Sequence, residues 1–168
     1  PNSRSDGDGE NKENYRWFFG LRAKGGADDF SRLIDLARHL DPGATSNSAL
    51  EAEVFHILNV EEMLRVWAVR FNTDDWDEWG ASRGKNCYLY RRSDTGQWEL
   101  LAWDMELTYG DTGSYLIPSS PTEAFNPGGF SEVNRLFNLP SVRRLYYGIL
   151  KEMVSGPGRW FHSDYLSP

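Results

Sequence analysis

The chain has 168 residues, the length of one ordinary domain, and its 39% share of hydrophobic residues excludes wholesale disorder. Its 18 Lys and Arg residues against 25 Asp and Glu residues give a net charge of −7, which disfavours generic binding to nucleic acid. A single cysteine, Cys87, excludes an internal disulfide framework, and three scattered histidines do not form a common zinc-binding spacing.

The N-terminal part of the chain is predicted to be a flexible or linker segment over residues 1–27. Residues 1–14 contain no large apolar side chain and are dense in Ser, Asp, Gly and Asn, so they bury too little surface to offset the entropy of ordering. The domain itself is expected over residues 28–168. Its apolar runs are far shorter than the roughly 20 residues that a membrane helix needs, so we expect no membrane span.

Two helices are predicted in the first half of this domain. From Asp28, apolar residues recur at the i, i+3, i+4, i+7 spacing of an amphipathic helix, which Asp41-Pro42-Gly43 then stops. After a short polar loop, Asn59 and Glu62 resemble a capping box at the start of a second helix that ends near Asn72. The apolar faces consist of Phe30, Leu33, Ile34, Ala37 and Leu40 in the first helix, and of Val60, Met63, Leu64, Trp67, Ala68 and Phe71 in the second.

The second half is predicted to begin with a β-hairpin. Residues 87–90 and 98–103 are aromatic and aliphatic, and they flank Ser93-Asp94-Thr95-Gly96, which has the chemistry of a turn. A loop rich in Pro, Ser and Gly over residues 118–129 is too long for a simple connection, so it is either functional or mobile. A short helix over residues 131–137 and a helix from Ser141 to Gly156-Pro157 follow. This order predicts an α+β fold in which helices dominate.

Three polar residues are expected to meet at one end of the hairpin. With the turn centred near Asp94 and Thr95, we expect Asn86 at the entrance to lie opposite Asp104 at the exit. The acidic stretch over residues 72–80 comes shortly before Asn86, so its Asp77 can reach the same end. Carboxylate and amide oxygens are ligands for Mg²⁺ or Ca²⁺, and such an ion would attract a phosphate group to this acidic protein.

Each candidate residue also has a purely structural interpretation. Asp77 fits a solvated acidic turn after a helix, and Asn86 and Asp104 fit turn positions at the ends of strands. Tryptophans near these residues could form a sugar-stacking platform. Trp98 and Trp103 are nevertheless expected in the core, where tryptophans beside helices and strands are more often found.

Five short motifs follow one another between residues 59 and 110: VEEMLRVWAVRF, DDWDEWG, RGKNCYLY, DTGQW and LLAWDMELTYG. In this order and spacing they resemble the CotH (spore coat protein H) kinases, a family of secreted or surface-associated atypical protein kinases. A weaker match, SVRRLYYGILKEMVSG, extends the resemblance toward the C-terminus, and the helix over residues 28–40 also has a counterpart in the family.

The resemblance implies a protein-kinase-like C-lobe, mostly helical, whose β-hairpin carries the metal site. Asp77 would orient or deprotonate the acceptor hydroxyl, Asn86 would bind a second divalent ion, and Asp104 would be the main metal ligand. The implied reaction transfers the γ-phosphate of ATP, with Mg²⁺ or Mn²⁺, to serine hydroxyls of a surface or coat protein. The family also implies a secreted or cell-surface location.

The chain departs from the family pattern in three respects. Glu106 stands where a second Asp is common. Asp74 and Asp75 compete with Asp77 for the catalytic place; the alignment of the WD pair favours Asp77, with Asp75 as second choice. No segment before Asp28 resembles the phosphate-covering loop of an N-lobe, so we expect the C-lobe portion of a longer protein.

Two other functions remain open. The chain could be a noncatalytic surface-attachment or coat-assembly module that keeps this fold, which the absence of N-lobe features favours. It could also be a carbohydrate-active protein that uses paired carboxylates and tryptophans, for which the separation of the Asp77 and Asp104 carboxyl groups would be diagnostic.

Overall fold

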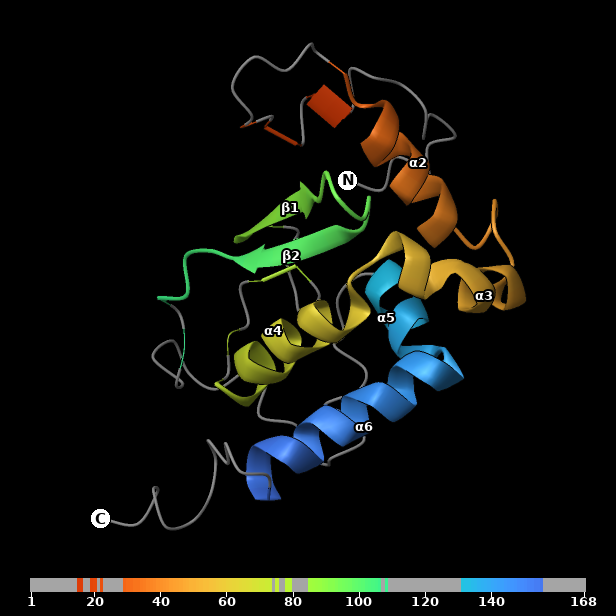
Figure 1. The fold of residues 1–168 in the computed structure, drawn as a ribbon. Coiled ribbons are helices and arrows are strands. Elements are labelled where there is room, and N and C mark those ends of the chain that lie inside the picture. Colours follow the sequence, from red (N-terminus) through yellow and green to blue (C-terminus); the bar gives the residue numbers. More distant parts are fainter. Residues whose placement is uncertain are drawn as a thin grey trace. The chain divides into compact units, whose positions relative to one another are not determined.

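The computed structural model describes residues 15–16, 19–20, 22, 29–73, 75, 78–79, 85–106, 108 and 131–155. The chain divides into two compact units, of which the first ends at Leu50 and the second begins at Glu51. Among the described residues, helices dominate and the strands form one two-stranded antiparallel sheet, as an α+β fold predicts (Figure 1). The elements are α2 (Ser31–Leu40), α3 (Asn47–Ile57), α4 (Val60–Asn72), β1 (Cys87–Arg91), β2 (Trp98–Ala102), α5 (Ser131–Asn138) and α6 (Pro140–Ser155).

Some of the expected segments lie outside the described residues. Most of the predicted linker over residues 1–27 and the whole predicted loop over residues 118–129 are among them. Within the part of the chain that the structure describes, no helix has both the length and the apolar character needed to cross a membrane.

Helix α2, in the first unit, confirms the first predicted helix. The Asp29 carboxylate accepts a hydrogen bond from the Ser31 N–H at 2.9 Å, just before the first turn. At the other end the Asp41 backbone becomes extended, and its side chain accepts a hydrogen bond from the Gly43 N–H at 2.9 Å. Polar side chains that bond to the backbone at both ends thus set the limits of this helix.

Helix α3 corrects the predicted polar loop between the first two predicted helices. Its start is capped by the Ser46 hydroxyl, which accepts a hydrogen bond from the Ala49 N–H at 3.2 Å. Leu50 and Val54 are fully buried, whereas Phe55 is 40% exposed, so the apolar residues are spread around the helix. The sequence therefore lacks the narrow apolar stripe on which the prediction of helices relied.

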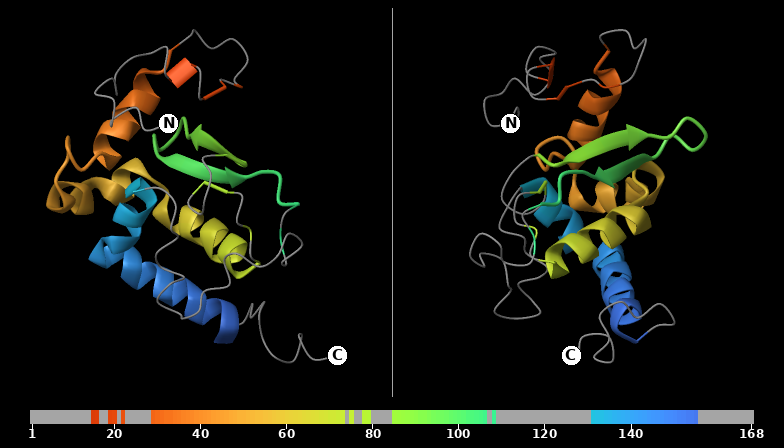
Figure 2. Two further views of the ribbon diagram at one scale, coloured as in Figure 1. Left: turned by 180° about the vertical axis from the view of Figure 1, so that it is seen from behind. Right: turned by 90° about the vertical axis from the view of Figure 1, so that its left-hand side faces the viewer.

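The second unit is built around α4. This helix contacts β2 on one side and α6 on the other, and α5 packs against α6 (Figures 1 and 2). Trp67 of α4, Phe137 of α5 and Tyr146 of α6 form a chain of rings, with centroids 5.3 Å and 5.0 Å apart. All three side chains are at most 1% exposed, so they form the centre of this core. The predicted apolar face of α4 is thereby confirmed, and the helix predicted from Ser141 buries one face as well.

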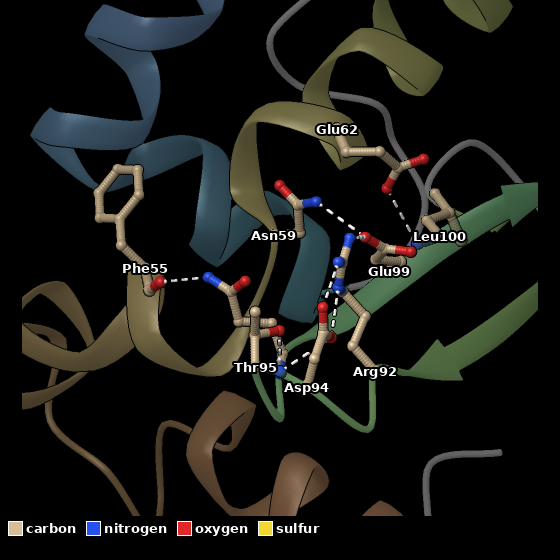
Figure 3. Close-up of polar contacts among 9 residues, drawn as sticks. Phe55, Asn59, Glu62, Arg92, Asp94, Thr95, Glu99 and Leu100 are labelled. Carbon is tan, nitrogen blue, oxygen red and sulfur yellow. Dashed lines mark hydrogen bonds and ion pairs between the residues drawn. The ribbon is translucent and has the colours of Figure 1, made fainter.

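The predicted capping box at the start of α4 is wrong, although the helix begins where it was predicted. The Asn59 amide donates to the Glu99 carboxylate at 2.9 Å, and the Glu62 carboxylate accepts from the Leu100 N–H at 3.2 Å (Figure 3). The Asn59 N–H also donates to the Trp98 carbonyl at 2.9 Å. Both predicted cap residues thus hold β2 against α4, a use of these side chains that depends on tertiary packing.

The predicted hairpin is confirmed, but its register differs by one residue. Cys87 pairs with Ala102 and Arg91 with Trp98, so the turn is centred between Asp94 and Thr95. Asn86 therefore faces Trp103 rather than Asp104. Arg92 forms ion pairs with Asp94 at 2.6 Å and with Glu99 at 3.1 Å, close to the turn (Figure 3).

Candidate functional site

Asn86 and Asp104 share an uncommon backbone conformation at the open end of the hairpin. Their φ angles are 59° and 57°, in the left-handed region that Asn and Asp tolerate better than other residues with a side chain. Asn86 directly precedes β1, and Asp104 follows Trp103 at the end of β2. Residues held in this region cluster at functional sites, where the surrounding structure maintains the strain.

A hydrogen bond across the hairpin brings the two residues to the same place. The Trp103 N–H donates to the Asn86 carbonyl oxygen at 3.2 Å, so Asp104 is one residue removed from the partner of Asn86. The structure thus brings together two of the three predicted site residues. The third, Asp77, and its competitor Asp74 lie outside the described residues.

Glu106 adds a second carboxylate beside Asp104. A side-chain hydrogen bond with Asp104 is the largest of the effects that raise the pKa of Glu106, and the charge of Lys85 opposes them. Both carboxylates are exposed. Two neighbouring carboxylates repel each other, and a divalent cation between them would offset that repulsion.

The donor set at the open end of the hairpin therefore fits a hard divalent cation such as Mg²⁺ or Mn²⁺. Asp104, Glu106 and Asn86 offer carboxylate and amide oxygens. Among the described residues, no group of three or more His, Cys, Asp or Glu side chains is placed to hold a metal. Protein atoms in this region would thus leave several coordination positions to water or to phosphate oxygens, which is the usual arrangement for Mg²⁺.

A buried cluster of charged residues lies between α4 and the open end of the hairpin. Arg70 is 1% exposed, Asp75 is not exposed and Glu78 is 1% exposed. The Arg70 Nε atom donates to Asp75 Oδ2 at 2.6 Å and lies 3.1 Å from Glu78 Oε2. Asp75 was the second choice for the catalytic carboxylate, and its complete burial against Arg70 is the environment of a structural ion pair instead.

Arg70 also contacts the main chain of Asn86. Its Nη1 atom donates to the Asn86 carbonyl oxygen at 2.6 Å, the same oxygen that accepts from the Trp103 N–H. In addition, the Asp75 N–H donates to the Arg70 carbonyl oxygen at 2.9 Å, so the chain wraps around the end of α4. One guanidinium thus joins the last turn of α4, the acidic stretch and the start of β1.

The buried cluster is close to electrical neutrality. Burial raises the pKa of Glu78 to about 9, the Arg70 charge opposes this, and the Asp75 charge adds to it. Glu78 lies farther from the guanidinium than Asp75 does, so the Arg70 charge offsets only part of the effect of burial, and the raised pKa favours the protonated form of Glu78. Burial likewise raises the pKa of the Cys87 thiol to about 11, with Arg70 opposing and Glu78 adding to the effect.

The sequence contained one signal of this cluster that the prediction did not use. Arg70 lies on the same face of α4 as Met63 and Trp67, at the i, i+4, i+7 spacing of the apolar stripe. A charged residue within an apolar stripe needs a buried partner. The acidic stretch that follows the helix supplies it.

One of the two tryptophans that were predicted in the core lies at the surface. Trp103 is 58% exposed and lies edge-on to Tyr88, with ring centroids 5.4 Å apart, so its predicted place in the core is wrong. Trp98 is half-buried at the start of β2. Trp79 is held by its main chain, since its carbonyl accepts from Trp67 Nε1 at 3.0 Å and its N–H donates to the Lys85 carbonyl at 3.0 Å.

Together, the described residues define an α+β domain with an exposed pair of carboxylates at the open end of a hairpin and a buried arginine beneath it. A family model described as "CotH kinase protein" matches residues 2–161. The match covers nearly the whole chain, so the chain belongs to the CotH kinase family, as its motifs predicted. A search of curated proteins found no match.

Proposed function

We propose that this chain is the C-lobe portion of an atypical protein kinase that transfers the γ-phosphate of ATP to serine hydroxyls of a surface or coat protein. One observation carries the proposal: in a member of the CotH kinase family, Asn86 and Asp104 meet at the open end of the hairpin with Glu106 beside them. Family membership is also the reason to propose a secreted or cell-surface location and a kinase-like C-lobe over residues 28–168.

The proposed roles follow from the charge that phosphoryl transfer must accommodate. Asp104 would be the main ligand of a divalent cation, Asn86 would bind a second one, and Glu106 would support Asp104. The cation, Mg²⁺ or Mn²⁺, would supply positive charge to the phosphate oxygens of ATP. Asp77 would orient the serine hydroxyl and accept its proton, while the serine oxygen bonds to phosphorus and the bond to ADP breaks.

The test measures nucleotide binding and phosphate transfer in the protein that contains this chain. Asp104→Asn removes the carboxylate but keeps a residue that tolerates a positive φ, so the fold should be retained. We expect it to abolish binding of ATP with Mg²⁺ or Mn²⁺ in calorimetry, and to abolish transfer of radiolabelled phosphate. Asp77→Asn should abolish transfer and leave nucleotide binding largely intact.

A matched control lies at the other end of the same hairpin. Asp94 is an exposed carboxylate in the turn, and Asp94→Asn should change neither binding nor transfer. If Asp104→Asn binds the metal and nucleotide as the wild type does, the proposed site is wrong. A wild-type protein that binds no nucleotide at all would instead support the noncatalytic attachment module.

A further inference from the structure

We propose that Arg70 is a positioning residue, a buried guanidinium that sets the backbone of Asn86 and holds the acidic stretch before it, so that the open end of the hairpin is shaped before any ligand binds. The inference rests on the proposed function, because Asn86 is there a ligand of the metal. The inference gives a role to a residue that lies outside the motifs that contain Asp77, Asn86 and Asp104.

The first argument is the geometry of the Asn86 carbonyl oxygen. It accepts one hydrogen bond from Arg70 Nη1 at 2.6 Å and another from the Trp103 N–H at 3.2 Å. Two donors on one carbonyl use both of its lone pairs and fix the orientation of the peptide group. Asn86 also has a φ angle of 59°, a backbone conformation that residues with a side chain rarely adopt, and such a conformation persists only where surrounding contacts hold the backbone.

The second argument is the shape of the donor. Arg70 reaches Asp75 with Nε and the Asn86 carbonyl with Nη1, so it uses two directions of its planar fork at once. A lysine ammonium at the end of a flexible stem keeps the charge but has no fixed fork. Arg70→Lys therefore keeps the positive charge at this position and removes the fixed geometry of the donors.

The third argument is energetic. A buried ion pair offers little net stability over apolar residues of similar volume. Arg70 Nη2 and Asp75 Oδ1 are, moreover, buried without a hydrogen-bond partner in the described part of the chain. The stripe of α4 is otherwise apolar around Arg70, with Met63 and Trp67 at most 1% exposed. Apolar residues in place of both Arg70 and Asp75 would serve stability as well, whereas only the guanidinium contacts both neighbouring segments.

The first experiment examines the backbone without any ligand. In Arg70→Lys, we expect amide hydrogen exchange at Trp103, which donates to the Asn86 carbonyl, to accelerate at least tenfold relative to amides in the middle of α6. Arg65→Lys is the matched control on the same helix, since Arg65 is exposed and paired with Glu61 at 3.0 Å and with Glu152 at 2.9 Å. Unchanged exchange at Trp103 in a folded Arg70→Lys protein would overturn the proposal.

The second experiment is a double-mutant cycle on the affinity for Mn²⁺ with ATP, at a temperature where all variants are folded. Arg70→Lys should weaken binding about 10- to 100-fold, as loss of a residue that orients a metal ligand does. In an Asn86→Ala background the same substitution should have little further effect, because Arg70 acts through Asn86. Fully additive losses would indicate a merely structural role and overturn the proposal.

The two experiments separate this inference from the function on which it rests. A wild-type protein that binds no metal nucleotide contradicts the proposed function, while the exchange measurement still decides whether Arg70 sets the hairpin end. If Arg70→Lys fails to fold, the double variant Arg70→Met with Asp75→Asn provides the second test, because replacing both partners leaves no charge unpaired in the interior. Normal exchange at Trp103 in that variant would equally overturn the proposal.

Discussion

Two pairs of carboxylates in this chain each lie near one basic side chain, and they differ in their access to water. Asp75 and Glu78 are buried around Arg70, whereas Asp104 and Glu106 are exposed near Lys85. In the buried pair, Asp75 forms an ion pair with the guanidinium, and burial favours the protonated form of Glu78. In the exposed pair, water stabilises the charges and leaves oxygens available to a cation.

The difference shows that similar residue sets acquire different roles through burial. The buried set cannot exchange its partners without leaving a charge unpaired in a dry interior, so it maintains a fixed shape. The exposed set can bind and release a ligand at little cost to the fold. The buried set contacts Asn86 through Arg70, and this contact connects the rigid region to the open one.

The largest predicted effect comes from removing the partner of the buried arginine. Asp75→Asn leaves Arg70 without its closest counter-charge, which should lower the free energy of unfolding by about 3 kcal/mol. The loss should lie at the lower end of the range for broken buried pairs, because Glu78 can ionise in place of Asp75. Urea denaturation at neutral pH measures it.

The exposed pair provides the comparison for this prediction. Asp104→Asn should change the free energy of unfolding by no more than about 0.5 kcal/mol, as surface substitutions usually do. Equal losses in the two variants would mean that the two pairs of carboxylates do not differ in the way proposed.

The second prediction concerns pH and the buried carboxyl of Glu78. Its pKa is raised from 4.5 to about 9, so between these values the folded state binds more protons than the unfolded state, and stability falls as pH rises. The slope from this group is at most about 1.4 kcal/mol per pH unit. Between pH 6 and 8 the wild type should therefore lose up to about 2.8 kcal/mol relative to Glu78→Gln, which cannot ionise.

Urea denaturation of both proteins at several pH values over this range checks the prediction. The two stability curves should approach each other toward pH 5 and diverge above it, with the variant the more stable at the alkaline end. Parallel curves would show that Glu78 is ionised in the folded protein, as a true partner of Arg70.

Local patterns in the sequence predicted the elements that carry the site, since α4 and α6 have apolar stripes and the hairpin has a recognisable turn. Contacts between distant segments could not be predicted in the same way. Asn59 and Glu62 have the pattern of a cap, yet both bond to β2, because the strand offers partners that the helix end cannot. Arg70 finds Asp75 and Asn86 only once the chain has wrapped around the end of α4.

The last predictions use two glycines that belong to neither pair of carboxylates. Gly148 lies exposed in α6, and a Cβ atom there would have no neighbour within 4 Å. Gly148→Ala should therefore raise the free energy of unfolding by about 0.5 to 1 kcal/mol, because alanine loses less backbone entropy in a helix. Thermal unfolding should show a higher midpoint with unchanged nucleotide binding.

Gly96 in the hairpin turn should respond in the opposite direction to the same substitution. Its φ angle is +77°, and a Cβ atom would lie 2.9 Å from Arg91 Nη2. The arginine tip can move aside, but the backbone strain stays, so Gly96→Ala should lower the free energy of unfolding by about 1 kcal/mol. A loss of nucleotide binding in Gly96→Ala, with the fold retained, would show that the turn is coupled to the opposite end of the hairpin. Unchanged binding would show that the open end of the hairpin keeps its shape independently of the turn.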